Sequence, residues 1–217
     1  NYAKATFFCL GENAGYYQET VQREYELGME VGTQPQSHKQ LTTLSGSELT
    51  NEIQESVDAI KKATGVAPIL MRPPYGAINK EVLAEAKKQG LCAENWSLET
   101  EDWKTKNADD TYKMVMTATD GDVVLLHDIH EYNINAVERF VPDLIAEGYQ
   151  LVTVSEMYAA RGETLDPGTI HYRTDPTTEA APETTAAGDE DGAAAGTASG
   201  STADEDDDTA AATTAAE

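Results

Sequence analysis

Four stretches of the sequence carry residue types that could do chemistry, and each follows a short apolar segment. The stretch "TQPQSH" ends in His38, and "MRPPYG" places Arg72 before two prolines and Tyr75. The stretch "SLETEDW" brings three carboxylates next to Trp103, and "LLHDIH" ends an apolar run with His127. Imidazoles and carboxylates beside an indole suit acid–base chemistry on a polar substrate such as a sugar. Together the four stretches predict one catalytic or binding site.

Each stretch also has a plainer structural interpretation. Arg72 could be an exposed residue of an ordinary proline turn, and Trp103 could pack beneath a solvated acidic loop. His127 and His130 lie three residues apart, which is weak support for a metal site without a helix, so we interpret His130 as a surface residue. Asp102, if it lies near His127, would raise the pKa of that imidazole and make it a general acid near neutral pH.

Short apolar segments alternate with helical patterns along the chain. Runs such as "VVLLH" and "PILM" are continuously apolar, as in parallel strands that are buried on both faces. We predict strands at residues 5–10, 29–31, 69–72, 91–97, 123–127 and 150–154. This alternation predicts an α/β fold with a parallel sheet, either open or closed into a barrel. Chemistry gathers at the carboxyl ends of strands in such folds, which is where all four stretches fall.

Four helices are predicted from apolar periodicity and from capping residues. Ser45 and Glu48 have the spacing of a capping box for a helix that closes at Gly65. Asn79 is the predicted N-cap of the next helix. Two further helices are predicted at residues 109–118 and 135–146. Pro142 would distort the last of these or split it into two pieces.

The composition divides the 217 residues into a folded part and an acidic tail. Residues 174–217 contain 12 acidic residues, no Lys, Arg or aromatic residue, and half of the net charge of −24. Such a segment buries too little apolar surface to offset its ordering entropy, so we predict a disordered linker rich in Ala, Thr, Asp and Glu. We therefore expect a domain at residues 1–160, a transition segment at 161–173 and this linker at 174–217.

The charge and the apolar pattern exclude several kinds of partner. An acidic chain lacks the clustered Lys and Arg side chains that nucleic acids or anionic membranes attract. No run of about 18 apolar residues could span a bilayer. Cys9 and Cys92 lie far apart in sequence, and we interpret them as small buried hydrophobes rather than a disulfide.

The four stretches, in this order and spacing, resemble the motifs of the NodB-type polysaccharide deacetylases, carbohydrate esterase family 4. The resemblance runs from "AKATFFCLGENA" near the start to "GYQLVTVSEM" near residue 157. It implies a deformed (β/α)7 barrel that removes acetyl groups from a polysaccharide with the help of a divalent metal, zinc or another ion. The implied substrates are acetylated glycans, either the N-acetyl groups of chitin or peptidoglycan or the O-acetyl groups of xylan.

The resemblance also implies roles for individual residues. His127 would protonate the leaving group, with Asp102 tuning its pKa, and Arg72 would orient the catalytic base. The backbone amide of Tyr75 would help to bind the oxyanion. The walls around the acetyl methyl group would be Trp103 and Leu125.

The chain departs from the family pattern at the metal. The family's HxxxH loop supplies two metal ligands, and here Gln34 stands in place of the first histidine while His38 is kept. The family's TFDDG motif, which supplies the base and a metal-binding aspartate, does not occur in the chain. We expect that motif and the first barrel strand to lie upstream of Asn1, which would leave the barrel incomplete. Because one imidazole does not hold zinc at useful affinity, we expect metal binding and activity to be impaired.

A second interpretation keeps the barrel and drops the catalysis. A barrel that lost its metal could still hold a glycan chain through Trp103, Tyr75 and Arg72, as a pseudoenzyme of a secreted multidomain protein. The Thr-, Ala- and acid-rich tail is typical of extracellular spacers, so we expect a secreted or cell-surface location in a bacterium.

Overall fold

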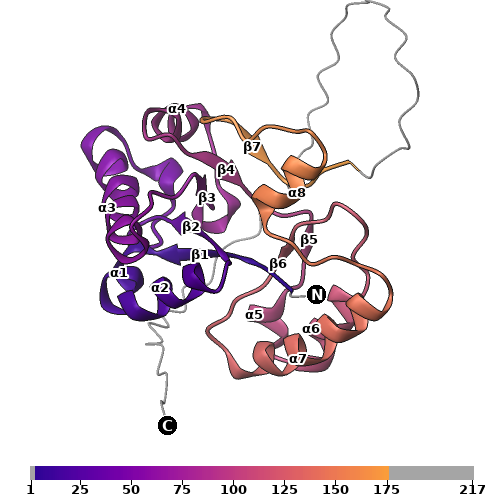
Figure 1. The fold of residues 1–217 in the computed structure, drawn as a ribbon. Helices are drawn as coiled ribbons and strands as arrows, with labels where there is room; N and C mark the ends of the chain where they lie inside the picture. The colour runs from indigo at the N-terminus through magenta and orange to yellow at the C-terminus, as the bar shows by residue number, and fades with distance from the viewer. Residues whose placement is uncertain (1–2, 176–217) are drawn as a thin grey trace, which may run out of the picture. The chain divides into compact units, whose positions relative to one another are not determined.

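The computed structural model describes residues 3–175, which form an α/β fold with two parallel sheets (Figure 1). The larger sheet has the strand order β1–β2–β3–β4–β7, and the smaller sheet pairs β5 with β6. The bounds of the strands are β1 Thr6–Leu10, β2 Glu30–Gln34, β3 Leu70–Met71, β4 Cys92–Glu94, β5 Leu98–Glu99, β6 Val124–Leu125 and β7 Ile170–His171.

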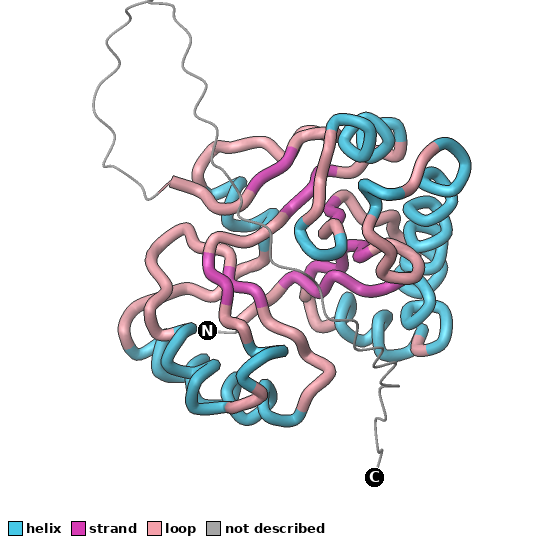
Figure 2. The backbone as a smooth tube through the Cα atoms, turned by 180° about the vertical axis from the view of Figure 1, so that it is seen from behind, coloured by secondary structure: helices cyan, strands magenta, loops and turns pink. Residues whose placement is uncertain are grey.

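Helices connect most of these strands and cover the larger sheet. Their bounds are α1 Gly11–Tyr16, α2 Gln18–Glu26, α3 Gly46–Thr64, α4 Lys80–Lys88, α5 Asp102–Thr105, α6 Ala108–Val115, α7 Glu131–Ala146 and α8 Val154–Ala160. Two single 3-10 turns lie at Leu41–Thr43 and Pro74–Gly76. In Figure 1, α1, α2 and α3 lie beside β1 and β2, while α5, α6 and α7 gather near β5 and β6. Figure 2 shows from behind that the strands lie between these two groups of helices.

The strand register brings the ends of neighbouring strands level with one another. In the parallel pair of β1 and β2, Leu10 lies opposite Gln34, the last residue of β2. Thr33 lies opposite Met71, the last residue of β3. Because parallel strands end at the same edge of a sheet, the loops that follow β2 and β3 begin side by side.

The apolar faces of α3 and α4 pack onto the middle of the larger sheet and form the main core. Leu49, Ile53 and Val57 of α3 recur at helical spacing and pack with Met71 and Ala93 of the strands. A second cluster, around Phe140 and Leu144, joins α6 to α7. Burial of such side chains is worth roughly 1.5–3 kcal/mol each relative to exposure, so these clusters fix the strand ends in place.

Several predicted elements have different bounds from those expected. Of the strand predicted at 91–97, only Cys92–Glu94 is a strand, β4; the next strand, β5, begins at Leu98 and belongs to the smaller sheet. The strand predicted at 150–154 is wrong, because residues 150–153 have no regular secondary structure and Val154 begins α8. The Thr153 hydroxyl accepts a hydrogen bond from the Glu156 amide, and the Glu156 carboxylate accepts one from the Thr153 amide, a capping box that favours the helix.

The helix predictions hold for α3 and α4 but not in every detail. Asn79 caps α4 by accepting a hydrogen bond from the Val82 amide at 2.9 Å. The capping box predicted at Ser45 is wrong, because Ser45 makes no side-chain hydrogen bond to α3 and Gly46 has a left-handed φ of 54°. Pro142 lies inside a single helix, α7, which begins at Glu131 rather than near residue 135.

Other expectations concern the cysteines, the tail and the membrane. Cys9 and Cys92 are both free thiols, as predicted, but only Cys92 is fully buried and Cys9 is partly exposed. Within the predicted transition segment, Ile170 and His171 form β7 against β4. The predicted linker lies outside the described residues from residue 176 onward. In the described part of the chain, no helix is both long and apolar enough to cross a membrane.

Candidate active site

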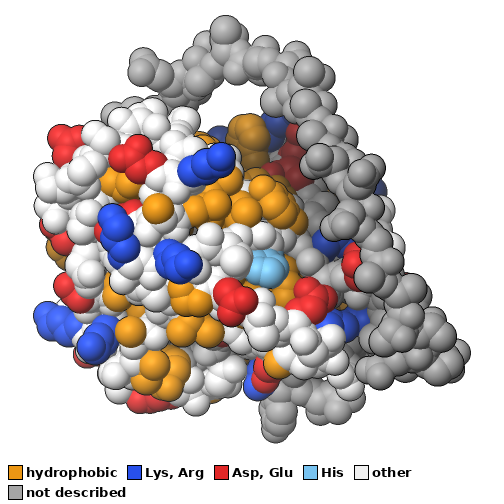
Figure 3. All heavy atoms as spheres, turned by 90° about the horizontal axis from the view of Figure 1, so that it is seen from above, with side chains coloured by type: hydrophobic (Ala, Val, Ile, Leu, Met, Phe, Trp, Pro, Cys, Tyr) orange, Lys and Arg blue, Asp and Glu red, His pale blue; other side chains and the backbone are white. Residues whose placement is uncertain are grey.

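The loops that follow β2, β3, β5 and β6 meet at one edge of the fold. The imidazole of His38 lies edge-on to the phenol of Tyr75, with 4.9 Å between ring centroids. Burial lowers the pKa of His38, and the nearby charge of His127 lowers it further. Figure 3 shows an exposed histidine side chain beside acidic and apolar side chains on one face of the molecule. The structure therefore brings together the residues that the four stretches singled out.

Asp102 and His127 form a hydrogen-bonded pair at the ends of β5 and β6. The Asp102 carboxylate is fully buried. Its Oδ1 lies 2.7 Å from Nδ1 of His127, and its Oδ2 accepts a hydrogen bond from the His127 backbone N–H at 2.8 Å. Oδ1 also accepts the Trp103 backbone N–H at 2.9 Å. Burial alone would raise the pKa of Asp102, but the hydrogen bonds and charge of His127 outweigh burial, so the pKa is lowered. The hydrogen bond that His127 donates to Asp102 in turn raises the pKa of His127.

Arg72 is buried, contrary to the interpretation of an exposed turn residue; only 8% of it is accessible. Its Nε donates to the Glu94 carbonyl oxygen at 3.1 Å, and its Nη2 donates to the Asn95 carbonyl oxygen at 2.9 Å. The guanidinium carbon lies 4.1 Å from the centre of the Phe8 ring, within cation–π range. Burial lowers the pKa of Arg72 to about 10, so the group stays positively charged at neutral pH.

The buried carboxyl group of Glu94 was not anticipated from the sequence. Its Oε1 accepts the Tyr158 hydroxyl at 3.3 Å, and its Oε2 has no hydrogen-bond partner among the described residues. Burial raises the pKa of Glu94 to about 8, although Arg72 acts in the opposite direction. A glutamate in the otherwise apolar strand "LCAEN" was the available signal, because an unpaired carboxyl is costly to bury.

The turn that carries Tyr75 has an unusual backbone. Tyr75 has a φ of 61° and Gly76 a φ of 65°, and the Gly76 carbonyl oxygen accepts a hydrogen bond from Asn95 Nδ2 at 3.1 Å. The phenol of Tyr75 is 68% exposed. The indole of Trp96 packs so closely that a Cβ on Gly76 would lie 3.1 Å from it. Both the left-handed φ and the close indole therefore call for glycine at this position.

Substitution of Gly76 by alanine is expected to destabilise the fold by about 1–2 kcal/mol, because a Cβ is disfavoured at this φ and would press on Trp96. Urea unfolding measures the difference. Gly15→Ala is the matched control, since no atom lies within 4 Å of a Cβ at that position. Equal midpoints for the two variants would contradict the prediction.

The apolar side chains predicted to bind substrate flank the Asp102–His127 pair. Trp103, next to Asp102 on α5, is 53% exposed, whereas Leu125 is buried. The hydroxyl of Thr100 donates to the Leu125 carbonyl oxygen at 2.7 Å and ties the two loops together. An exposed indole beside a buried polar pair is a suitable surface for a sugar ring or an acetyl methyl group.

The loop of His38 is held by Glu52 of α3. The Ser37 amide donates to Glu52 Oε1 at 2.6 Å, and His38 itself has a left-handed φ of 61°. Nε2 of Gln34 lies 3.1 Å from Nε2 of His38. With Gln34 as the donor, His38 Nε2 is the acceptor, so Gln34 uses the lone pair that a metal ion would need.

The donor set around His38 does not fit a zinc site. A catalytic zinc takes three protein ligands, whereas Gln34 offers only a neutral amide to add to one imidazole. No group of three or more His, Cys, Asp or Glu side chains in the described range 3–175 is arranged to hold a metal ion. The residues described here therefore cannot by themselves supply the metal site that the resemblance implies.

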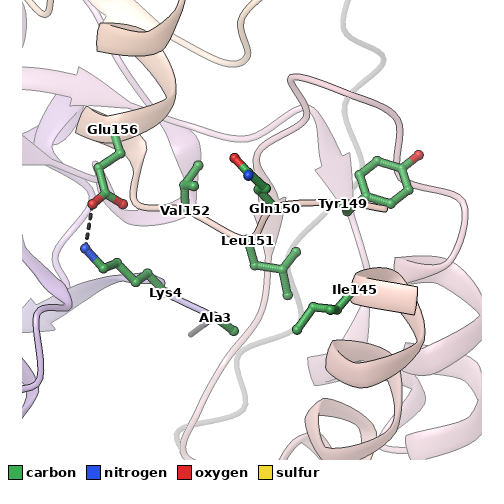
Figure 4. A pocket seen from close by; sticks show the side chains of 8 residues that line it. All are labelled: Ala3, Lys4, Ile145, Tyr149, Gln150, Leu151, Val152 and Glu156. Atoms are coloured by element: carbon green, nitrogen blue, oxygen red, sulfur yellow. Dashed lines mark hydrogen bonds and ion pairs between the residues drawn. The ribbon is translucent and has the colours of Figure 1, made fainter. Parts of the chain in front are cut away.

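A separate pocket of about 250 Å³ lies beside the start of β1, away from these motifs (Figure 4). Lys4 and Glu156 line it and form an ion pair at 2.5 Å. Leu151 and Ile145 supply an apolar part of its wall. None of the residues of the four stretches lines this pocket, so it is not the candidate active site.

Comparison with known proteins shows the family of the chain. Residues 1–93 match the family model described as polysaccharide deacetylase. Over 174 residues the chain is 42% identical to the peptidoglycan-N-acetylglucosamine deacetylase PgdA of Listeria monocytogenes, an alignment that covers 79% of this chain and 36% of that protein. The chain thus spans about a third of the length of this curated relative.

Solved structures show the same relationship. The peptidoglycan deacetylase PdaC of Bacillus subtilis superimposes with a TM-score of 0.70 and 38% identity, covering 74% of this chain and 78% of that chain. A mutant of a family 4 pseudoenzyme superimposes with a TM-score of 0.67 and 26% identity, covering 71% of this chain and 57% of that chain. The chain belongs to the polysaccharide deacetylase family, carbohydrate esterase family 4.

Proposed function

We propose that this chain recognises an acetylated glycan and supplies the proton-donating half of a deacetylation reaction. The observation that carries the proposal is the buried Asp102 carboxylate, which lies 2.7 Å from Nδ1 of the partly exposed His127. A carboxylate at Nδ1 leaves Nε2 as the other ring nitrogen that can carry a proton toward a substrate. The neighbouring Trp103 gives a sugar ring a surface on which to lie.

The proposed reaction is hydrolysis of an acetamide. Water adds to the carbonyl carbon, the carbon–nitrogen bond breaks, and acetate and a free amine leave. His127 would give the leaving nitrogen its proton, and Asp102 would hold the imidazole in orientation. The Tyr75 amide would donate to the oxyanion, and Trp103 with Leu125 would enclose the methyl group.

Arg72 would orient the carboxylate base of this reaction. The pKa of Glu94 is raised to about 8, so Glu94 does not neutralise Arg72 at pH 7. The guanidinium therefore keeps a net positive charge that can pair with another carboxylate. The chain contains no TFDDG sequence, so that carboxylate is not assigned to any of its residues.

We propose that Gln34 impairs hydrolysis by weakening the metal site. In the family, a bound divalent ion, zinc or another, would polarise the acetyl carbonyl. Here the Gln34 amide is hydrogen-bonded to His38, and a neutral amide is a poor substitute for a second imidazole. The two sheets would be parts of a deformed (β/α)7 barrel.

The alternative function is glycan binding without catalysis. It is favoured by the Gln34–His38 hydrogen bond and by the structural likeness to a family 4 pseudoenzyme. Measurement of acetate release from an N-acetylglucosamine tetramer, with and without added zinc, separates the two functions. Turnover by the unmodified chain supports the enzyme, whereas binding of the tetramer without any acetate release supports the binding module. The absence of both binding and turnover would overturn the proposed function.

Trp103→Ala is expected to weaken binding of that tetramer about ten-fold, because an aromatic surface of this kind contributes roughly 0.5–1.5 kcal/mol beyond its buried area. Isothermal titration calorimetry measures the affinity. Tyr25→Ala, which removes an exposed aromatic side chain from α2, serves as the control. A similar loss in both variants would mean that Trp103 is not part of the binding surface.

The substrate class and location follow from the relatives. The Listeria protein is described as acting on peptidoglycan N-acetylglucosamine, and we propose the same class of glycan for this chain. With such a substrate, the protein would act outside the cytoplasm, at the bacterial cell wall. We propose residues 1–160 as the deacetylase domain, 161–173 as a transition segment and 174–217 as an acidic linker.

A further inference from the structure

Asn133, near the start of α7, contacts both members of the Asp102–His127 pair. Its Nδ2 donates to Oδ2 of Asp102 and to the carbonyl oxygen of His127, the latter at 2.6 Å. Its Oδ1 accepts the hydroxyl of Thr111, on α6, at 3.3 Å. Asn133 and Thr111 are both buried. One amide group thus connects two helices to the two loops that carry the site.

These three contacts fix the orientation of the Asn133 amide. If its oxygen and nitrogen were exchanged, the oxygen would face two acceptors, the Asp102 carboxylate and the His127 carbonyl. Buried acceptor pairs of this kind are strongly unfavourable in a low-dielectric interior. The amide therefore has one stable orientation, and that orientation holds Oδ2 of Asp102 in place.

The Asp102 carboxylate is fully used by these contacts. Oδ2 accepts from Asn133 and from the His127 amide, while Oδ1 accepts from the Trp103 amide and lies against the His127 ring. With Oδ2 held, the carboxylate cannot rotate away from the ring. Without Asn133, Oδ2 would lose one donor and the carboxylate one constraint on its rotation.

We propose that Asn133, fixed by Thr111, is a positioning residue that holds Asp102 so that its Oδ1 keeps the His127 ring protonated at Nδ1. The inference rests on the proposed function, in which His127 delivers its proton from Nε2. It predicts a definite tautomer and a definite titration for His127. Other groups that act on this imidazole are Glu99, Asp128 and His38, which are left unchanged by substitution of Asn133.

The test uses the whole chain and needs no substrate. Nitrogen-15 NMR of the His127 ring reports its tautomer, and a pH titration reports its pKa. In the unmodified protein we expect protonated Nδ1 at neutral pH. In Asn133→Ala we expect a mixture of tautomers and a pKa that falls toward about 6.5.

Asn107→Ala is the matched control, because Asn107 caps α6 through the Asp109 amide and makes no hydrogen bond to Asp102. Thr111→Val removes only the hydroxyl that donates to Asn133, and it is expected to lower the pKa of His127 by a smaller amount. If Asn133→Ala does not fold, Thr111→Val is the variant that tests the inference.

Unchanged His127 signals in folded Asn133→Ala, or in Thr111→Val where that variant decides, would overturn the inference. Equal shifts in Asn107→Ala would do the same. Failure of acetate release and of glycan binding in the unmodified protein would instead overturn the proposed function alone.

Discussion

Glu94→Gln is expected to raise the free energy of unfolding by about 5 kcal/mol at pH 9 and to leave it nearly unchanged at pH 4.5, since each unit of pKa shift is worth about 1.4 kcal/mol. The cause is burial, which raises the pKa of Glu94 to about 8 in the fold. Oε2 has no partner among the described residues, so the ionised form is poorly solvated there.

The sign of the effect follows from proton binding. The folded protein keeps the Glu94 proton up to about pH 8, whereas the unfolded chain releases it near its ordinary pKa of 4.5. Stability from this group is therefore complete below pH 4.5 and is lost as the pH rises to about 8. A glutamine side chain does not titrate, and its amide oxygen can still accept the Tyr158 hydroxyl.

Urea unfolding between pH 4.5 and pH 9 measures the difference between the two proteins. Glu55→Gln, at an exposed position of α3, is the control for loss of a negative charge. Parallel stability curves for the unmodified protein and Glu94→Gln would show that Glu94 is not held neutral. The comparison subtracts the titration of every other group, including His127.

The sequence predicted the elements whose signals are local. Asn79 was recognised as an N-cap and Gly65 as a helix end, and both positions hold because capping geometry depends on a few adjacent residues. In contrast, β7 is only two residues long and forms because its backbone pairs with that of β4. Such a strand has no periodicity to detect. The error at 150–154 had a visible signal, the Thr153–Glu156 capping box.

In the candidate site, too, some residues could be predicted from the sequence and others could not. The motif residues could be placed together because all of them follow predicted strands, and the structure brings His38, Tyr75 and His127 to one edge. Asn133 could not be foreseen, because its role depends on where α6 and α7 pack against the loop of Asp102. Polar residues that support a site by tertiary contacts have no sequence pattern of their own.

The second large effect concerns the loop of His38. Gln34→His is expected to raise the zinc affinity of the chain at least about ten-fold, because even residues that only support a metal ligand change affinity by that much. Two nitrogens at about 2.1 Å from a tetrahedral zinc lie about 3.4 Å apart. Nε2 of Gln34 already lies 3.1 Å from Nε2 of His38, so the backbone places the two side chains correctly for a shared ion.

Calorimetric titration with a zinc salt measures the affinity, at a pH above the lowered pKa of His38, so that its imidazole is neutral. Gln40→His is the matched control, because it adds a histidine to the same loop at an exposed position two residues from His38. A gain in Gln34→His alone shows that Gln34 is what weakens the metal site. No gain, or an equal gain in the control, would mean that Gln34 does not occupy the place of a metal ligand. In that case the loop of His38 would have to be explained by its contacts with Glu52 and Tyr75 alone.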